Sequence, residues 1–190
     1  MAAEQDKVIL VNEQNEWLGM MDKLAAHKEG LLHRAISVFI VNEEKQLLMQ
    51  QRADEKYHSG GLWSNTCCSH PMQAESSDSA AHRRLKEELG FDCELSPAFI
   101  LRYKAEMDNG LIENEYDHVY FGVYNGPVNV NTTEVKAYRY ISIEELLVWL
   151  QKDPDVFTEW FRIALPKFME YFEAVKDNVS NPGTRNNLYQ

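Results

Sequence analysis

The sequence predicts an α/β fold, because two strand hairpins near the N-terminus precede one well-delimited helix, and further strands and helices follow it. The chain has 190 residues and is 44% hydrophobic, which is enough for one sizeable core and too little for two large domains. We therefore expect a single domain over residues 1–176. Residues 177–190 carry Asn, Gly, Pro and Ser with little to bury, so we expect a disordered tail there.

The charge balance limits the classes of partner. With 19 basic and 30 acidic residues the net charge is −11, which disfavours binding to nucleic acid and to anionic membrane surfaces. A small-molecule substrate is expected, and an anionic one would need a local basic pocket. The N-terminus shows neither a signal peptide nor a spanning segment, and the three cysteines are badly spaced for disulfides. We expect reduced thiols and a cytoplasmic location.

The first half of the chain predicts two hairpins and a long loop. Residues 7–21 hold an apolar run, a polar turn and a second strand, and a short polar link with two histidines follows. Residues 34–41 and 46–52 are rich in strand-forming side chains and flank a polar turn. Residues 53–73 are polar and contain glycines and a proline, which indicates a loop.

The clearest helix covers residues 76–89. Ser76 to Asp78 supply N-caps, apolar side chains recur every four residues to Leu89, and Gly90 suits the position after the last turn. Strands are expected near 98–105, 115–124 and 135–141. A helix capped by Ser142 and a final helix over 158–174 should follow.

The clearest helix and the loop before it resemble the Nudix box, G-x5-E-x7-R-E-U-x-E-E-x-G-U, in which U is apolar. The sequence departs from this pattern at Ser69, in place of the first glycine, and at Arg84, in place of the first glutamate of the R-E-U-x-E-E run. The resemblance implies a Nudix fold, with a mixed β-sheet core sandwiched between helices. The matching positions are Glu75, Arg83, Leu85, Glu87, Glu88, Gly90 and Phe91.

The replacement of a Nudix-box glutamate by Arg84 affects how the helix can bind metal ions. A row of carboxylates on one helix face can hold Mg²⁺ against a diphosphate. Arg84 and Glu88 are four residues apart and share a face, which in an arbitrary helix would indicate a weak surface ion pair. Within the box, Arg84 instead favours one Mg²⁺ and an arginine clamp on phosphate over the several ions and water nucleophile of a hydrolase.

A second group of residues has metal-ligand chemistry. Three imidazoles and two carboxylates suit Zn²⁺, Mn²⁺ or Fe²⁺ at five or six coordinates. Individually, each histidine could lie on the surface or in the core, and a Glu-x-Glu pair could be one solvent-facing side of a strand. Imidazoles also occur outside the group, at His58, His82 and His118. The group consists of His27, His33, His70, Glu113 and Glu115.

Four segments resemble, in order, the signature stretches of type I isopentenyl-diphosphate isomerases. The resemblance runs from about Lys7 to the Trp160 region, and the Trp-x-Asn-x-x-Cys-x-His-Pro and Glu-Asn-Glu strings are specific to that family. The interval from His27 to His33 is one residue shorter than in the family pattern. The segments are Ala25-Ala26-His27, Leu32-His33, Trp63-Ser64-Asn65-Thr66-Cys67-Cys68-Ser69-His70-Pro71 and Glu113-Asn114-Glu115.

The resemblance implies the cofactors and the phosphate contacts. The five-residue group would bind one divalent ion, Mn²⁺ or Zn²⁺ with Fe²⁺ as a further option. Glu88 and the backbone carbonyl of Cys68 would hold Mg²⁺ on the diphosphate. Phosphate contacts would come from Lys23, Arg52, Lys56 and Arg84.

The resemblance also implies the reaction, in which isopentenyl diphosphate and dimethylallyl diphosphate interconvert through a tertiary carbocation. Cys68 and Glu115 would be the proton-handling pair, with Tyr103 near the carboxylate and Trp160 facing the hydrocarbon. An aromatic face can stabilise a cation by about 2 kcal/mol without being protonated. The residues alone also allow Trp160 to fill a helix face and Cys68 to be a buried structural thiol.

The sequence also allows two other functions. A Nudix diphosphate hydrolase is the nearest, and Arg84 argues against it. A non-catalytic domain with structural zinc at Cys67, Cys68 and His70 is the other, although adjacent cysteines fit tetrahedral coordination poorly. For an isomerase we expect a monomer or a weak dimer.

Overall fold

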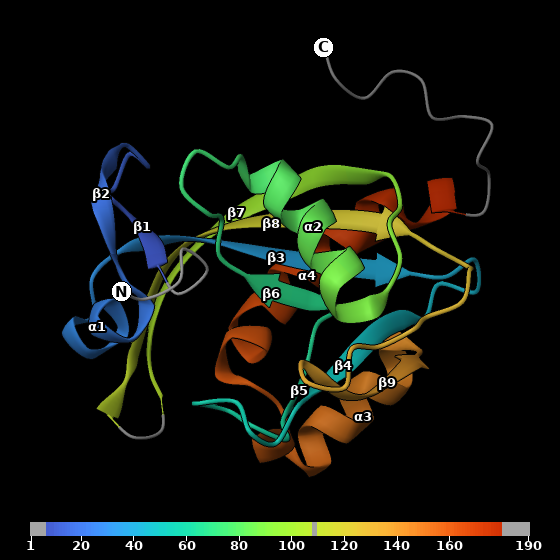
Figure 1. Ribbon diagram of the computed structural model, residues 1–190. Coiled ribbons are helices and arrows are strands. Elements are labelled where there is room, and N and C mark those ends of the chain that lie inside the picture. Colours follow the sequence, from blue (N-terminus) through green and yellow to red (C-terminus); the bar gives the residue numbers. More distant parts are fainter. Residues whose placement is uncertain (1–6, 108–109, 180–190) are drawn as a thin grey trace.

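A computed structural model describes residues 7–107 and 110–179 and contains one nine-stranded sheet with helices on both faces (Figure 1). The helices are α1 (Lys23–Glu29), α2 (Ser77–Leu89), α3 (Ile143–Lys152) and α4 (Glu159–Val179), with a short 3-10 helix at Pro154–Val156. The strands are β1 (Lys7–Val11), β2 (Trp17–Asp22), β3 (His33–Val41), β4 (Leu47–Arg52), β5 (Trp63–Ser64), β6 (Cys67–Ser69), β7 (Leu95–Glu106), β8 (Ile112–Val123) and β9 (Val135–Ile141).

Strand β3 organises the sheet. It runs parallel to β8 over nine paired positions and antiparallel to β1, β4 and β6, while β7 pairs antiparallel with β8 and β9 with β4. The sheet is therefore mixed, as the resemblance to the Nudix box implies. Long-range pairing sets the register of β8 against β3. This register determines which side chains of the two strands lie next to one another in the cleft.

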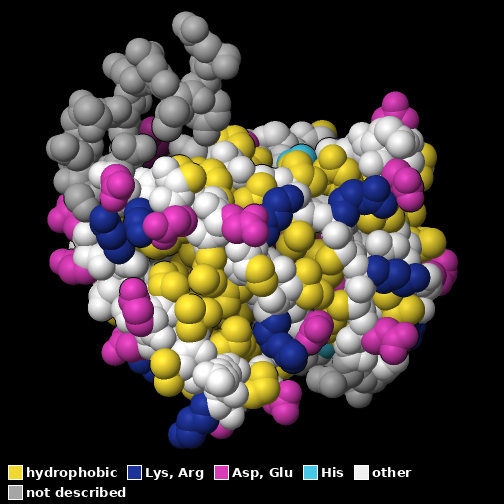
Figure 2. Space-filling view, turned by 180° about the vertical axis from the view of Figure 1, so that it is seen from behind, with side chains coloured by type: hydrophobic (Ala, Val, Ile, Leu, Met, Phe, Trp, Pro, Cys, Tyr) yellow, Lys and Arg dark blue, Asp and Glu magenta, His cyan; other side chains and the backbone are white. Residues whose placement is uncertain are grey.

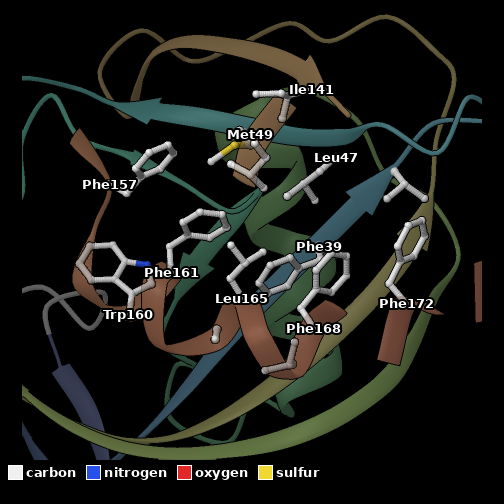
Figure 3. Close-up of a cluster of buried hydrophobic side chains, with 14 of the residues drawn as sticks. Phe39, Leu47, Met49, Ile141, Phe157, Trp160, Phe161, Leu165, Phe168 and Phe172 are labelled. Carbon is white, nitrogen blue, oxygen red and sulfur yellow. The ribbon is translucent and has the colours of Figure 1, made fainter. Parts of the chain in front are cut away.

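Two hydrophobic clusters fill the two faces of the sheet, because successive strand side chains point to opposite sides. Phe39 and Val41 face α4, where Phe161 and Phe168 pack against them in the cluster that Figure 3 shows. Their neighbours on β3 face α2 and pack against its apolar stripe; they are Ile36, Val38 and Ile40. Helices thus cover both faces, which confirms the predicted α-β-α arrangement.

The ends of α2 are fixed as the sequence indicates. Ser76 Oγ accepts a hydrogen bond from the amide of Ser79 at 3.0 Å. Gly90 ends the helix at φ +73°, and a Cβ at this position would lie 2.5 Å from the carbonyl oxygen of Asn129. The amide of Asn131 donates to the carbonyl of Glu88 at 2.9 Å. The chain before β9 is therefore held against the end of α2, next to the Nudix box.

Three details differ from the sequence prediction. The polar link after β2 is helix α1, capped by Asp22, whose side chain accepts from the amide of Ala25. The loop predicted over residues 53–73 contains β5 and β6, two short strands that exist because β4 and β3 pair with them. Helix α4 continues to Val179, and residues 180–190 of the expected tail lie outside the described residues.

The surface mixes both signs of charge. From behind the view of Figure 1, acidic and basic side chains alternate around patches of hydrophobic side chains (Figure 2). Among the described residues, no helix has the length and apolar character needed to cross a membrane.

Candidate active site

A cleft at one end of the sheet collects the predicted site residues. Its walls come from α1, the loop between β4 and β5, β6, the C-terminal half of α2, β7, β8 and the start of α4. All predicted site side chains line it except His27 and His33, which lie fully buried. Residues as far apart in the sequence as Lys23 and Trp160 therefore meet in one place.

Strand β8 supplies three carboxylates to one face of the sheet. Glu113, Glu115 and Asp117 alternate along the strand and are 4%, 7% and 2% exposed, so the Glu-x-Glu pair does not face solvent. On the neighbouring strands, Tyr103 and His33 are the register partners of Glu115. The Tyr103 hydroxyl lies 2.8 Å from Glu113 Oε2 and 2.6 Å from Glu115 Oε2, and thus bridges the two carboxylates.

The two glutamates ionise differently. Burial, with the neighbouring charge of Glu115, raises the pKa of Glu113 well above its usual value. Burial also opposes ionisation of Glu115, but the neighbouring imidazoles of His33 and His70, whose Nε2 atoms lie 3.6 and 3.1 Å from Glu115 Oε1, outweigh it and hold the pKa of Glu115 well below its usual value. The negative charge of Glu115 therefore favours a proton on Glu113, next to the hydroxyl of Tyr103.

Two buried histidines have the orientation of metal ligands. His27 Nδ1 lies 2.7 Å from the carbonyl oxygen of Lys23, and His33 Nδ1 lies 2.8 Å from that of Leu31. Each Nδ1–H therefore donates to the backbone, which leaves the Nε2 lone pair available, as in most metal-bound histidines. Both Nε2 atoms are buried without a hydrogen-bond partner. An uncompensated buried acceptor is costly, so these residues fit a bound cation.

The shortened interval between the two histidines does not separate them. Helix α1 ends at Gly30, which takes φ +61°, and the chain then enters β3 at His33. The two imidazole centroids lie 4.7 Å apart, and that of His70 lies 5.8 Å from His27 and 5.1 Å from His33. His70 Nε2 is 3.1 Å from Glu115 Oε1.

The metal-type donors form two overlapping groups. In each group the ligand atoms all lie within 4.8 Å of one another. The first contains four of the five predicted ligands, and the second joins the fifth, Glu113, to His27 and to His58, which the sequence interpretation leaves outside the group. Nitrogen and carboxylate oxygen are donors that a borderline divalent ion accepts. The first group is His27, His33, His70 and Glu115.

The sulfur of Cys68 is held by hydrogen bonds. Its thiol donates to Asn65 Oδ1 at 2.9 Å, and the indole Nε1–H of Trp160 donates to the sulfur at 3.2 Å. The amide group of Asn65 cannot turn, because its Nδ2 donates to the carbonyls of Val38 and Cys67 at 3.1 and 3.0 Å. The thiol proton of Cys68 therefore has a defined direction.

The adjacent cysteines occupy different environments. Cys67 is fully buried in the cluster beneath α2, whereas Cys68 contacts the cluster beneath α4 and lines the cleft. Because neighbouring residues of a strand point to opposite faces, Cys67 and Cys68 do not share a ligand site, and a structural zinc held by both with His70 is ruled out. Burial, assisted by Asp117, raises the pKa of the Cys68 thiol to about 12, so it keeps its proton.

Arg84 is the centre of a cluster of charges and is not a surface ion-pair partner. Its side chain is 17% exposed and that of Glu88 is 5% exposed. Its guanidinium pairs with Glu88, with Glu87 Oε2 at 2.7 Å and with Glu134 Oε2 at 3.1 Å. Burial alone would lower the pKa of Arg84, but the carboxylates of Glu88 and Glu134 raise it. The ammonium of Lys56 also pairs with Glu134, so one carboxylate lies between two predicted phosphate contacts.

The other two predicted phosphate contacts lie over aromatic rings. The guanidinium carbon of Arg52 is 4.9 Å from the ring centroid of Trp160, and the ammonium of Lys23 is 5.1 Å from that of Tyr57. Arg52 also donates to the carbonyls of His58 and Ser59, at 3.3 and 3.2 Å. It therefore fixes the loop between β4 and β5 against the cleft.

The sequence interpretation missed several residues of this site. His58 lies in a segment read as a plain loop, and Glu134 precedes β9 without a motif. Asn65 lies in the Trp-x-Asn-x-x-Cys-x-His-Pro string, and the sequence alone does not indicate that its amide holds the Cys68 thiol. The position of Asp117, two residues after Glu115 on β8, indicates a further buried carboxylate on the same face of the strand.

Comparison with solved structures supports the fold. The crystal structure of DR0079 from Deinococcus radiodurans superimposes with a TM-score of 0.65 at 18% identity, covering 77% of this chain and 89% of that one. A MutT Nudix hydrolase from Burkholderia pseudomallei gives a TM-score of 0.58 at 21% identity, covering 72% and 97%. At these identities the similarity concerns the fold alone.

Comparison of sequences identifies the family. The NUDIX domain family model matches residues 31–161. A protein of Pectobacterium atrosepticum named isopentenyl-diphosphate Delta-isomerase is 51% identical over 174 residues, covering 92% of this chain and 97% of its own. A protein of Burkholderia multivorans with the same name is 46% identical over 163 residues, covering 86% and 93%. The chain therefore belongs to the isopentenyl-diphosphate Delta-isomerase family of Nudix-fold enzymes.

Proposed function

We propose that this chain interconverts isopentenyl diphosphate and dimethylallyl diphosphate by adding a proton to one carbon and removing one from a neighbour. The observation that carries the proposal is the position of Cys68 and Glu115 in one cleft, beside a cluster of cationic side chains. Both can exchange a proton with a bound hydrocarbon. The relatives' name supports the same reaction, and favours it over the hydrolase alternative.

Cys68 and Glu115 divide the proton transfers. In one direction of the reaction one group donates a proton to the alkene and the other removes a proton from the adjacent carbon. In the reverse direction their roles exchange. The thiol reaches the substrate protonated, since Asn65 accepts its hydrogen and burial raises the pKa of Cys68 to about 12. Tyr103 hydrogen-bonds Glu115 and can move a proton between the two glutamates. Each positioned group contributes a factor of ~10²–10⁴.

The intermediate is a tertiary carbocation, which requires stabilisation and the absence of water. Trp160 is 5% exposed and places its indole against the sulfur of Cys68, so an aromatic face lies next to the proposed proton donor. A desolvated cation on such a face gains on the order of 2 kcal/mol. The aromatic cluster beneath α4 holds this indole in place.

The diphosphate would bind at the charged cluster. Arg84 and Lys56 lie on either side of Glu134, with Arg52 along the same wall and Lys23 on α1. Mg²⁺ held by Glu88 and the Cys68 carbonyl would neutralise phosphate charge, and a divalent Mn²⁺, Zn²⁺ or Fe²⁺ ion in the histidine cluster would orient Glu115 and favour its ionised form. Gln50 Nε2 orients Glu88 through a 2.9 Å hydrogen bond to Oε2.

Hydrolysis of the diphosphate needs a different arrangement of carboxylates and metal ions. A Nudix hydrolase assembles several metal ions and an attacking water from carboxylates of its box. Here Glu87, Glu88 and Glu134 all pair with Arg84, so a fixed cation already occupies the middle of the carboxylate cluster. The same guanidinium would pair with phosphate oxygens in exchange for some of these carboxylates, which suits holding the group intact.

The proposal is tested by following the phosphorus of isopentenyl diphosphate by ³¹P NMR while purified protein acts with Mg²⁺ and a second divalent ion. We expect a new diphosphate ester, identified as dimethylallyl diphosphate by chromatography, without free phosphate or pyrophosphate. Release of pyrophosphate or phosphate at the rate of substrate loss would establish the hydrolase alternative instead.

A further inference from the structure

His58 is a cleft residue that the proposed reaction does not use. It lies on the loop between β4 and β5, is 6% exposed, and contacts Trp160 edge-on with ring centroids 5.7 Å apart. We propose that His58 is an additional ligand of the divalent ion in the histidine cluster, so that this ion is offered four imidazoles and two carboxylates. The inference rests on the metal site of the proposed function and enlarges it.

The distances around His58 suit coordination. Its Nε2 lies 3.6 Å from Glu113 Oε1, and the ligand atoms of His58, His27 and Glu113 are all within 4.8 Å of one another. Two donors about 2.1 Å from one ion lie roughly 3.0 Å apart when adjacent and about 4.2 Å apart when opposite. Small movements of side chains would therefore bring these three donors onto one ion.

His27 shows that the two groups of donors surround one ion. Its Nδ1–H donates to the carbonyl of Lys23, so only Nε2 remains, and a neutral imidazole nitrogen has one lone pair. His27 therefore cannot bind two ions at once. It belongs to both groups. An ion on His27 Nε2 consequently lies within reach of both groups of donors.

The surroundings of His58 leave the required nitrogen available. Its Nδ1 lies 3.2 Å from the hydroxyl of Ser59, which can accept a hydrogen from it. Nε2 then carries the lone pair, and it is the atom nearer Glu113. The Arg52 guanidinium donates to the carbonyls of both loop residues and so fixes their position. His58 can thus present the lone pair of Nε2 to the cluster, as a metal ion needs.

A fourth imidazole changes which ion the site prefers. Nitrogen donors favour Co²⁺, Ni²⁺ and Zn²⁺ over Mg²⁺ and Mn²⁺, which prefer oxygen. Six protein donors also give the ion an octahedral site. Loss of His58 would leave five protein donors and a five-coordinate site. Visible absorption of bound Co²⁺ distinguishes these cases, because octahedral Co²⁺ absorbs weakly and five-coordinate Co²⁺ absorbs more strongly.

The test is a titration of chelator-treated protein with Co²⁺, comparing wild type with His58→Asn and His58→Ala. Variant His33→Asn serves as the positive control, and His82→Asn, whose histidine pairs with Asp92 away from the cleft, as the matched negative control. Circular dichroism and the melting temperature of each metal-free protein establish folding. No step of this test measures isomerase activity.

We expect both His58 variants to bind Co²⁺ at least ~10-fold more weakly and to absorb more strongly per bound ion, while His82→Asn matches wild type. If His33→Asn weakens binding and the His58 variants keep the wild-type affinity and spectrum, the inference is wrong and the metal site of the proposed function stands. If His33→Asn also binds like wild type, both the inference and that metal site are wrong.

Discussion

The indole nitrogen of Trp160 lies 3.2 Å from the sulfur of Cys68. The two residues are 92 positions apart, on α4 and β6, and the same indole closes the end of the aromatic cluster beneath α4 (Figure 3). The sequence allows two roles for Trp160, filling the core or contacting the substrate. Its position allows both, because one edge packs in the core and the ring also lines the cleft.

The two adjacent cysteines provide the first prediction. Cys68→Ala removes a proton-transfer group and should lower the isomerisation rate by at least ~10². Cys67→Ala removes a small buried side chain on the other face of β6, so it should keep most of the activity and lose some thermal stability. Steady-state rates and melting temperatures of both variants check this. Comparable activity of Cys68→Ala and wild type would remove Cys68 from the reaction.

Trp160 should act through its aromatic face. Replacement by Leu removes this face and should reduce kcat by about 30-fold, which corresponds to about 2 kcal/mol of cation stabilisation. Trp160→Phe keeps a smaller aromatic face and should retain more of the rate. Because both variants lose the hydrogen bond to Cys68, the difference between them isolates the aromatic contribution. Equal kcat values for the Leu and Phe variants would show that the ring serves packing only.

Glu134 should compete with phosphate for Arg84 and Lys56. Without Mg²⁺, Glu134→Gln leaves both cations without this carboxylate, and inorganic pyrophosphate should bind roughly 3–10-fold more tightly. Calorimetry measures the affinity. Glu173→Gln, which removes an exposed carboxylate paired with Lys176 on α4, is the control and should have no effect. Weaker pyrophosphate binding by Glu134→Gln would show that this carboxylate does not compete with the anion.

The buried imidazoles should make the metal-free protein sensitive to acid. Burial lowers the pKa of His58 to about 3 and that of His70 to about 4, from 6.5. Between about pH 4 and 6.5 the unfolded chain therefore binds more protons than the folded one, and the free energy of unfolding falls as pH falls. With chelator present, the free energy of unfolding of His70→Asn, measured in urea, should change less with pH between about pH 4 and 6.5 than that of wild type. An equal change with pH in both proteins would show that the pKa of His70 is not lowered in the folded protein.

Much of the fold follows from local sequence, but the short elements do not. The caps of α2 at Ser76 and Gly90 and the capping box at Ser142 have local signatures, and all three are confirmed. Helix α1 has seven residues and little apolar periodicity. Strands β5 and β6 are two and three residues long and depend on pairing with β4 and β3, which no local window contains.

The candidate site is likewise predicted only in part from the sequence. His70 and Glu115 are predicted because they lie within strings that are specific to the family, and both line the cleft. His58 and Glu134 were missed because each becomes relevant only when a loop packs against a distant element: Arg52 fixes the first loop, and Asn131 attaches the second to α2. Neither contact leaves a spacing pattern in the sequence.

The most direct test of the account is the conversion of isopentenyl diphosphate in heavy water with Mg²⁺ and a second divalent ion present. Protonation of the terminal alkene carbon by a solvent-exchanged group predicts dimethylallyl diphosphate that carries deuterium in its newly formed methyl group, with the diphosphate intact. Pyrophosphate or phosphate without any isomerised, deuterated product would contradict the account.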